Sequence, residues 1–318
     1  MTHPLSIAVA GLGTVGGGVL KLLRDNADLV AARAGRPIAV TAVSARDRTR
    51  DRGVSLSGLR WYEDAVALAG DPAVDVVVEL IGGADGPAHA LVQAALARQA
   101  EERKVPLAFE AAVAGGIPVI KALREGLAAN RIRRIAGILN GTCNYILTQM
   151  RERGREFAEV LADAQKLGYA EADPSFDIDG VDAAHKLAIL AALAFGRPVA
   201  FDAVHIEGIR RISALDIAFA TELGYRIKLL GIASRADGPT DGPRGGLGEG
   251  ISARVHPCMV PQSAPIATVD GVFNAVVAEG DFVGRVMLEG RGAGAGPPGG
   301  KTRRSPGPGA GSGRSPRF

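Results

Sequence analysis

The sequence predicts an α/β fold with two domains, and three observations support this prediction. At 318 residues the chain is long enough to form two separate cores. Short apolar segments alternate with helical patterns through residues 5–110, as expected for a parallel sheet with crossover helices. Further apolar segments with strand-like composition follow after residue 130 and are interrupted by helical patterning.

The first apolar segment, Ile7-Ala-Val-Ala, ends in a glycine-rich turn that opens a helix. In such a turn Gly11 makes the bend, Gly13 lets the backbone approach a pyrophosphate, and Gly16 allows close packing of helix on strand. The phosphates then lie at the N-terminus of the helix. We therefore expect a Rossmann-type dinucleotide-binding domain, with its cofactor held by Gly11, Leu12, Gly13, Thr14, Val15 and Gly16.

Residues 38–44 are the expected second strand. An NAD-selective site usually has an acid at the end of this strand, where it binds the ribose 2′-hydroxyl. In this sequence Ser44 and Arg46 precede the first acid, Asp47. That order favours a 2′-phosphate, so NADP(H) is expected over NAD(H), with Arg46 as a cofactor-binding residue.

Residues 75–83 indicate a buried strand that ends in glycines, and a helix over 87–103 and a strand over 105–110 are expected to follow. Glu110 then leads into a glycine-rich turn before Pro118. One interpretation is a plain strand–helix connection with Pro118 in the first turn of the helix. The other is a hard-cation site formed by Glu110 and backbone carbonyls. The local sequence favours the plain connection.

Residues 134–146 predict a strand, a polar turn and the start of a helix. Cys143 lies at that start, and because no general base is evident beside it, a packed thiol is expected rather than a nucleophile. Further apolar segments fall at 203–209, 225–233, 255–260 and 272–278, with a polar surface loop at 236–250.

The most informative stretch is residues 168–186, where five carboxylates fall within twelve residues and a lysine follows. Helical spacing begins at Val181 and places Asp182 and Lys186 at i,i+4 on one face. An amine beside a carboxylate at the start of a buried helix suits a positioned proton donor. Two alternatives stay open at this level: Asp179 or Asp182 as helix caps, and a calcium-binding loop.

Composition argues against several classes of function. Residues 291–318 hold six of the 37 Lys and Arg and no acid, so the remaining 31 basic residues face 34 acidic ones. A mildly acidic body with 4% aromatic residues offers no basic stripe for nucleic acid. No segment has the composition of a signal peptide or a membrane span, and the two cysteines form no metal-binding pattern. A cytoplasmic protein is expected.

Taken together, these segments resemble bacterial homoserine dehydrogenase over nearly all of residues 5–290. The resemblance lies in the motifs at residues 11–16, 78–83, 110–118, 139–145 and 168–186. It implies a homodimeric enzyme that interconverts L-aspartate 4-semialdehyde and L-homoserine with NAD(P), on the route to threonine, methionine and isoleucine. It also implies a substrate and dimerisation domain of the α/β class after the Rossmann domain.

The resemblance also assigns residue roles. Lys186 becomes the proton donor to the carbonyl oxygen, Asp182 a residue that orients substrate, and Glu171 the ligand of the substrate amino group. Gly168 and Gly292 are implied to lie at the cofactor. A sodium ion is implied at the turn that the local sequence had left as a plain connection, with the ligands Glu110, Val113, Gly115 and Ile117.

Two departures from the family pattern stand out. After Ala100 the chain lacks a strand–loop–helix segment that carries a catalytically important lysine in the family. The C-terminus becomes rich in Gly, Pro and Arg and lacks the regulatory ACT domain of longer members, a composition that a frameshift in a GC-rich gene would give. The rival to an active enzyme is therefore a catalytically impaired or inactive nucleotide-binding remnant of the family.

The expected domain organisation follows from these segments. Residues 1–110 form the dinucleotide-binding domain and residues 111–281 the catalytic and dimerisation domain. Residues 282–296 return to pack on the first domain at the cofactor. Residues 297–318, which are rich in Gly and Pro, are expected to be disordered.

Overall fold

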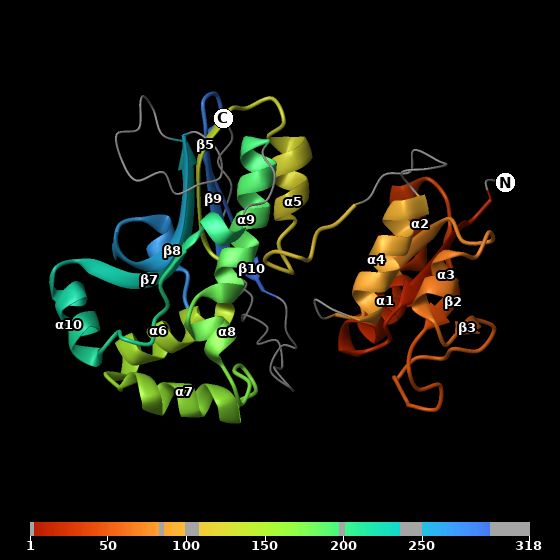
Figure 1. The fold of residues 1–318 in the computed structure, drawn as a ribbon, viewed down its shortest axis with the longest axis horizontal. Helices are drawn as coiled ribbons and strands as arrows, with labels where there is room; N and C mark the ends of the chain where they lie inside the picture. The colour runs from red at the N-terminus through yellow and green to blue at the C-terminus, as the bar shows by residue number, and fades with distance from the viewer. Residues whose placement is uncertain (1–2, 83–85, 99–107, 197–200, 236–249, 293–318) are drawn as a thin grey trace, which may run out of the picture. The chain divides into compact units, whose positions relative to one another are not determined.

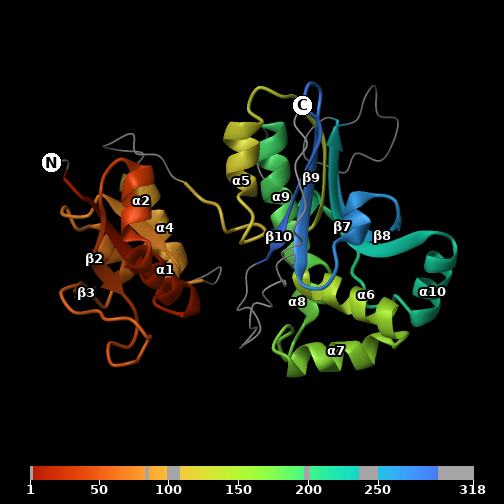
Figure 2. The ribbon, with the colours of Figure 1, turned by 180° about the vertical axis from the view of Figure 1, so that it is seen from behind.

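The computed structural model describes residues 3–82, 86–98, 108–196, 201–235 and 250–292. The chain divides into two compact units, Met1–Ala108 and Phe109–Phe318 (Figures 1 and 2). This division lies two residues before the boundary expected at residue 110.

The first unit is a parallel sheet in the order β3-β2-β1-β4 with helices around it (Figure 1). The strands are β1 (Leu5–Ala10), β2 (Ile38–Ser44), β3 (Arg60–Tyr62) and β4 (Val76–Glu79). The helices are α1 (Thr14–Asp25), α2 (Ala27–Ala34), α3 (Ala65–Ala69) and α4 (Pro87–Arg98). The predicted strand at 38–44 is confirmed residue for residue.

Strand β1 is apolar apart from Ser6, as expected for a strand whose two faces are both covered. Successive side chains point to opposite faces, so Ala8 and Ala10 join one core cluster with Leu68, while Val9 joins another with Leu20. The helix predicted over 87–103 ends at Arg98 in the described part of the chain. Half of the strand predicted over 105–110 lies outside the described residues, and the other half, residues 108–110, is not in a strand.

The second unit is built on a six-stranded sheet in the order β10-β9-β5-β7-β8-β6, antiparallel except for the β6–β8 pair. The strands are β5 (Ile132–Ile138), β6 (His205–Ile206), β7 (Tyr225–Arg235), β8 (Ile251–Pro261), β9 (Phe273–Gly280) and β10 (Gly284–Arg291). The longer helices are α6 (Gly141–Arg153), α7 (Phe157–Lys166), α9 (Val181–Phe195) and α10 (Ala214–Glu222). The short helical segments are α5 (Val119–Lys121), the π-helical turn η2 (Ala122–Gly126), α8 (Ser175–Ile178), η3 (Phe201–Ala203) and η4 (Pro265–Thr268).

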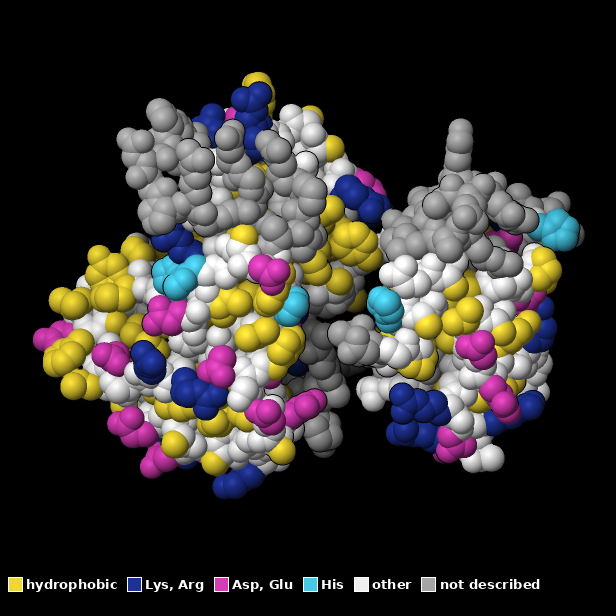
Figure 3. All heavy atoms as spheres, in the orientation of Figure 1, with side chains coloured by type: hydrophobic (Ala, Val, Ile, Leu, Met, Phe, Trp, Pro, Cys, Tyr) yellow, Lys and Arg dark blue, Asp and Glu magenta, His cyan; other side chains and the backbone are white. Residues whose placement is uncertain are grey.

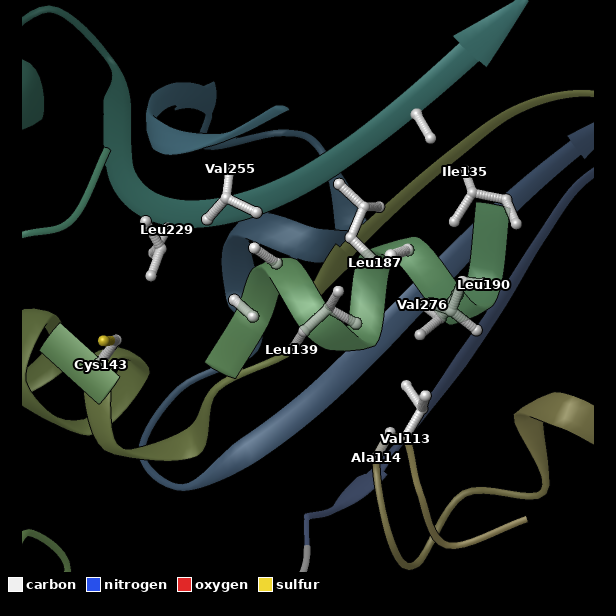
Figure 4. Close-up of a cluster of buried hydrophobic side chains, with 14 of the residues drawn as sticks. Val113, Ala114, Ile135, Leu139, Cys143, Leu187, Leu190, Leu229, Val255 and Val276 are labelled. Carbon is white, nitrogen blue, oxygen red and sulfur yellow. The ribbon is translucent and has the colours of Figure 1, made fainter. Parts of the chain in front are cut away.

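Helix α9 is the centre of the larger core. Leu187 and Leu190 are fully buried, and Figure 4 shows them with Leu229, Val255 and Val276, which come from three strands. Large-to-small changes at such positions typically cost about 2–5 kcal/mol. Because the helix is buried along this face, the side chains at its first two turns have a rigid base.

Residues 284–291 form β10, an edge strand of the second unit that pairs along its length with β9. This differs from the prediction, in which they belonged to a separate returning segment, 282–296. The hairpin is fixed by its turn, where Asn130 Oδ1 accepts from the Val283 amide at 2.9 Å and Asp281 Oδ1 accepts from the Arg131 amide at 2.9 Å. The rest of the returning segment after Gly292, and the tail expected to be disordered, lie outside the described residues.

In the described part of the chain, no helix has both the length and the apolar composition needed to cross a membrane. Acidic and basic side chains are interspersed over the visible face of the second unit (Figure 3).

Candidate active site

The stretch 168–186 folds as a loop, a single helical turn and the start of α9. Gly168 has a φ of +75°, and Thr142 Oγ1 donates to the Tyr169 carbonyl at 2.8 Å, which ties the loop to α6. Gly180, with a φ of +86°, is the N-cap of α9 and supplies no side-chain cap. The alternative in which Asp179 or Asp182 caps this helix is therefore wrong.

Asp179 has a different partner. Arg210 donates from Nε and one terminal nitrogen to its two carboxylate oxygens at 2.9 and 2.8 Å. This hydrogen bond is the largest cause of the lowered pKa of Asp179. The ion pair fastens the loop before α9 to the loop after β6.

Lys186 and Asp182 form the pair predicted from their spacing. The Lys186 Nζ atom donates to Asp182 Oδ2 at 2.6 Å and to the Leu139 carbonyl at 3.2 Å. The two side chains are 25% and 19% exposed, so the ammonium lies at the surface of the core and not within it. An ammonium has three N–H donors, and among the described residues two of them have these partners.

Asn140 joins a second carboxylate to this pair. Its Nδ2 atom donates to Asp177 Oδ1 at 2.7 Å and to Asp182 Oδ2 at 2.8 Å. Its Oδ1 atom accepts from the Cys143 amide at 2.8 Å and so caps α6. The result is a continuous cluster from Asp177 through Asn140 and Asp182 to Lys186.

Burial is the main cause that raises the pKa of Asp177, and the charge of Asp182 raises it further. The hydrogen bond from Asn140 acts in the opposite direction. Burial also raises the pKa of the Cys143 thiol well above its usual range, with the nearby carboxylates adding to the effect. Cys143 donates its thiol proton to the Asp177 carbonyl at 3.2 Å, which fits the expected packed thiol and not a nucleophile.

The glycine-rich turn in the first unit has the shape that a dinucleotide needs. Gly11 has a φ of +95°, and a Cβ atom there would lie 2.5 Å from the backbone of Leu80 and Ile81. A Cβ on Gly16 would overlap the carbonyl oxygen of Gly11, whereas one on Gly13 would meet nothing within 4 Å. The open side at Gly13, directly before the N-terminus of α1, fits a phosphate group.

Comparison with known proteins gives the family. A model for the homoserine dehydrogenase NAD-binding domain matches residues 11–101, and a homoserine dehydrogenase model matches residues 118–300. The homoserine dehydrogenases of Neisseria gonorrhoeae and Pseudomonas aeruginosa are 48% and 47% identical over 312 residues, covering 92% of this chain and 69% of each relative. This chain belongs to the homoserine dehydrogenase family.

A solved structure agrees with this assignment. The homoserine dehydrogenase from Thiobacillus denitrificans is 47% identical and superposes with a TM-score of 0.82, covering 93% of this chain and 70% of that one. The resemblance inferred from sequence motifs is thus confirmed, together with the α/β fold and its Rossmann-type first domain. Homoserine dehydrogenases are oxidoreductases that use a nicotinamide cofactor.

The structure places the other predicted site residues in different surroundings. Glu171 and Gly168 are exposed on the loop after α7, and Gln165 Nε2 donates to the Glu171 carbonyl at 3.0 Å. Among the hydrogen bonds of the described residues, none joins Glu171 to the Lys186 cluster. Gly292 follows β10, and a Cβ atom there would overlap the Asn274 side-chain oxygen. The roles of these three residues stay predictions.

The side chain of Glu110 binds the start of the following helix. Glu110 Oε1 accepts from the Ile120 amide at 2.8 Å, and Oε2 accepts from the Lys121 amide at 3.0 Å. The carboxylate therefore satisfies two amides at the start of α5. Within the described residues, no group of three or more His, Cys, Asp or Glu has a metal-binding arrangement. The sodium site, with carbonyl ligands from Val113, Gly115 and Ile117, stays a prediction.

Two members of the cluster, Asn140 and Asp177, were missed as site residues. The sequence did carry a signal for the first, because an Asn between a strand and a helix is a preferred N-cap. Nothing local indicated that its amide group would also reach Asp177 and Asp182, which lie 37 and 42 residues further along the chain.

Proposed function

We propose that this chain interconverts L-aspartate 4-semialdehyde and L-homoserine, with Lys186 as the proton donor and acceptor. A bound nicotinamide cofactor supplies the hydride in the reductive direction. Negative charge then develops on the aldehyde oxygen, and the Lys186 ammonium stabilises this charge and transfers a proton to the oxygen. The observation that carries the proposal is the half-buried ammonium fixed by Asp182 and the Leu139 carbonyl.

In this mechanism Asp182 has two roles. Its carboxylate, 2.6 Å from the ammonium nitrogen, holds the lysine side chain in place and sets the direction of the remaining N–H donor. It also orients the substrate, as the family resemblance implies. Glu171 binds the substrate ammonium group, for which an exposed carboxylate on the neighbouring loop is chemically suited.

For the cofactor we propose NADP(H) in preference to NAD(H). Arg46 is exposed directly after β2 and is free to approach a 2′-phosphate. Asp47 is less suited to a ribose hydroxyl, because its Oδ1 atom accepts from the Thr49 amide and hydroxyl at 2.8 and 2.7 Å. These hydrogen bonds are the largest causes of its lowered pKa.

Three further parts belong to the proposal. A homodimer and a sodium ion at the 110–117 turn rest on family resemblance, and a cytoplasmic location rests on the composition of the sequence. The substrate is a small molecule, and neither nucleic acid nor a membrane is part of the proposed function. The family resemblance implies that a segment is missing after Ala100, so activity has to be tested on this chain itself.

The test is an assay of NADPH oxidation with L-aspartate 4-semialdehyde, run beside thermal melts with and without NADPH. Substrate-dependent oxidation and a melting temperature raised by NADPH are expected, since a ligand that binds the folded state stabilises it. Stabilisation by NADPH without turnover would contradict the proposal and identify the inactive nucleotide-binding remnant.

A further inference from the structure

The amide group of Asn140 is the one feature of the cluster that touches two carboxylates and a helix terminus at once. Asn140 is 5% exposed, and both polar atoms of its side chain have partners among the described residues. The orientation of the amide is fixed by those partners. Its oxygen faces the N–H of Cys143, and its nitrogen faces two carboxylate oxygens that can only accept.

We propose that Asn140 is a positioning residue that holds Asp177 and Asp182 on a single amide group and thereby fixes Asp182 against Lys186. The two Nδ2–H bonds are 2.7 and 2.8 Å long, and Asp182 accepts the lysine and the amide on the same oxygen, Oδ2. Without the amide donor, two partly buried carboxylates would face each other across a gap, and like charges repel strongly where water is excluded.

The backbone beside Asn140 strengthens this inference. The Leu139 carbonyl accepts from Lys186 Nζ at 3.2 Å, so one turn supplies both the carbonyl and the amide that surround the Asp182–Lys186 pair. The same residue begins α6 as its N-cap. The end of β5 and the start of α6 therefore determine the position of Lys186 together with α9. This inference rests on the proposed role of Lys186.

The charged and titratable groups around Asp177 come from two helices and a loop. Asp182 and Lys186 face it from α9, and Cys143 and the Thr142 hydroxyl lie at the start of α6. Asp179 follows directly after α8, the helical turn that holds Asp177. Of these, Asp179 is paired with Arg210. The hydrogen bond from Asn140 lowers the pKa of Asp177, so its removal is expected to raise that pKa.

Two substitutions separate the positioning role from the capping role. Serine and aspartate are both good N-caps, so Asn140→Ser and Asn140→Asp keep an acceptor for the Cys143 amide. Asn140→Ser removes the amide that reaches both carboxylates, and Asn140→Asp replaces it with a third negative charge. Asn26→Ser is the control, because Asn26 is exposed in the other unit and its side chain donates only to the Leu22 carbonyl among the described residues.

The first readout does not depend on activity. The titration of Asp177 is followed by NMR in protein labelled at the aspartate carboxyl carbon, with Asp177→Asn giving the assignment. We expect the Asp177 pKa to rise in Asn140→Ser and to rise further in Asn140→Asp, with the control unchanged. An Asp177 titration that is the same in all four proteins would overturn the inference.

The second readout is kinetic. In both Asn140 variants kcat should fall by roughly tenfold to a hundredfold, as expected for a small misplacement of a catalytic group, and the acid limb of the pH profile should move to higher pH. The KM for NADPH should stay near the wild-type value. A kcat and pH profile equal to wild type would contradict the inference. An inactive wild-type chain would contradict the proposed function, and the carboxyl titration would then decide the inference by itself.

Discussion

Replacing Gly208 with alanine should disturb the candidate site from outside, because the loop after β6 packs directly on the loop before α9. A Cβ atom built on Gly208 lies 2.7 Å from the carbonyl carbon of Asp179 and closer still to the Ile178 carbonyl oxygen. Real Cβ atoms essentially never approach below 3.0 Å. All of these obstructing atoms belong to the backbone, which cannot move aside as a flexible side chain could. The Ile209 amide already donates to the Ile178 carbonyl at 2.8 Å, which holds the two segments together.

The magnitude follows from which atoms have to move. Overpacking of this kind typically costs about 1–3 kcal/mol, and a clash with backbone belongs at the upper end of that range. For a domain of this size, a loss of about 3 kcal/mol lowers the Tm by roughly 6–12 °C. The segment that must shift carries Asp177 on one side of Asp179 and leads into Asp182 on the other. A displacement of about 1 Å there can cost on the order of a hundredfold in rate.

The assay combines a thermal melt with steady-state kinetics of NADPH oxidation. Gly18→Ala is the control, because Gly18 lies inside α1 and a Cβ atom there meets nothing within 4 Å. That variant should be stabilised by about 0.5–1 kcal/mol, since alanine favours a helix interior. If Gly208→Ala melted and turned over like wild type, the close packing of the two loops described here would be refuted.

Three further predictions concern the cofactor, the cluster and the segment that is expected to be missing after Ala100. Arg46→Glu should weaken NADPH binding by about 1.5–3 kcal/mol while changing NADH binding much less; an unchanged preference between the two cofactors in a fluorescence titration would argue against contact with the 2′-phosphate. Asp177→Asn should raise the Tm at neutral and alkaline pH, because the folded-state pKa of this acid is raised and its ionisation costs stability as pH rises. The gain in Tm should vanish at acid pH, where the carboxyl group is neutral. An equal gain at every pH would contradict this origin. Inserting the family's strand–loop–helix segment between Ala100 and Glu101 should raise both Tm and turnover, and the same insertion with alanine at its lysine should raise the Tm alone; equal turnover in the unmodified and repaired chains would show that the segment is dispensable.

Features fixed by local spacing were predictable from the sequence. The turn from β1 to α1 depends on glycines at set intervals, and the structure shows the positive φ and close approaches that exclude a Cβ at Gly11 and Gly16. The pairing of Asp182 with Lys186 depends only on the i,i+4 geometry of a helix. In both cases the interacting groups lie within one turn or one connection.

Features that depend on distant segments were not predictable in the same way. Asn140 reaches its two carboxylates only after α6 and α9 have packed on the same sheet. Strand β10 was missed because its polar and glycine residues interrupt the apolar pattern expected of a strand. Its pairing with β9 can be recognised only from the register of the hairpin in the structure. At Glu110 the carboxylate binds two amides of the following helix, whereas the described residues before it, 108–110, are not in the strand that the local sequence predicted.

The most direct test of the central claim is the rate of NADPH oxidation by Lys186→Ala, with Lys166→Ala as the control. Lys166 is 77% exposed on α7 and pairs only with Asp163 among the described residues, at 3.5 Å. Lys186→Ala is expected to lose turnover with L-aspartate 4-semialdehyde while its NADPH affinity stays close to wild type, and Lys166→Ala is expected to keep both. Turnover by Lys186→Ala at the wild-type rate, or a parallel loss of NADPH affinity, would contradict the assignment of Lys186 as the proton donor.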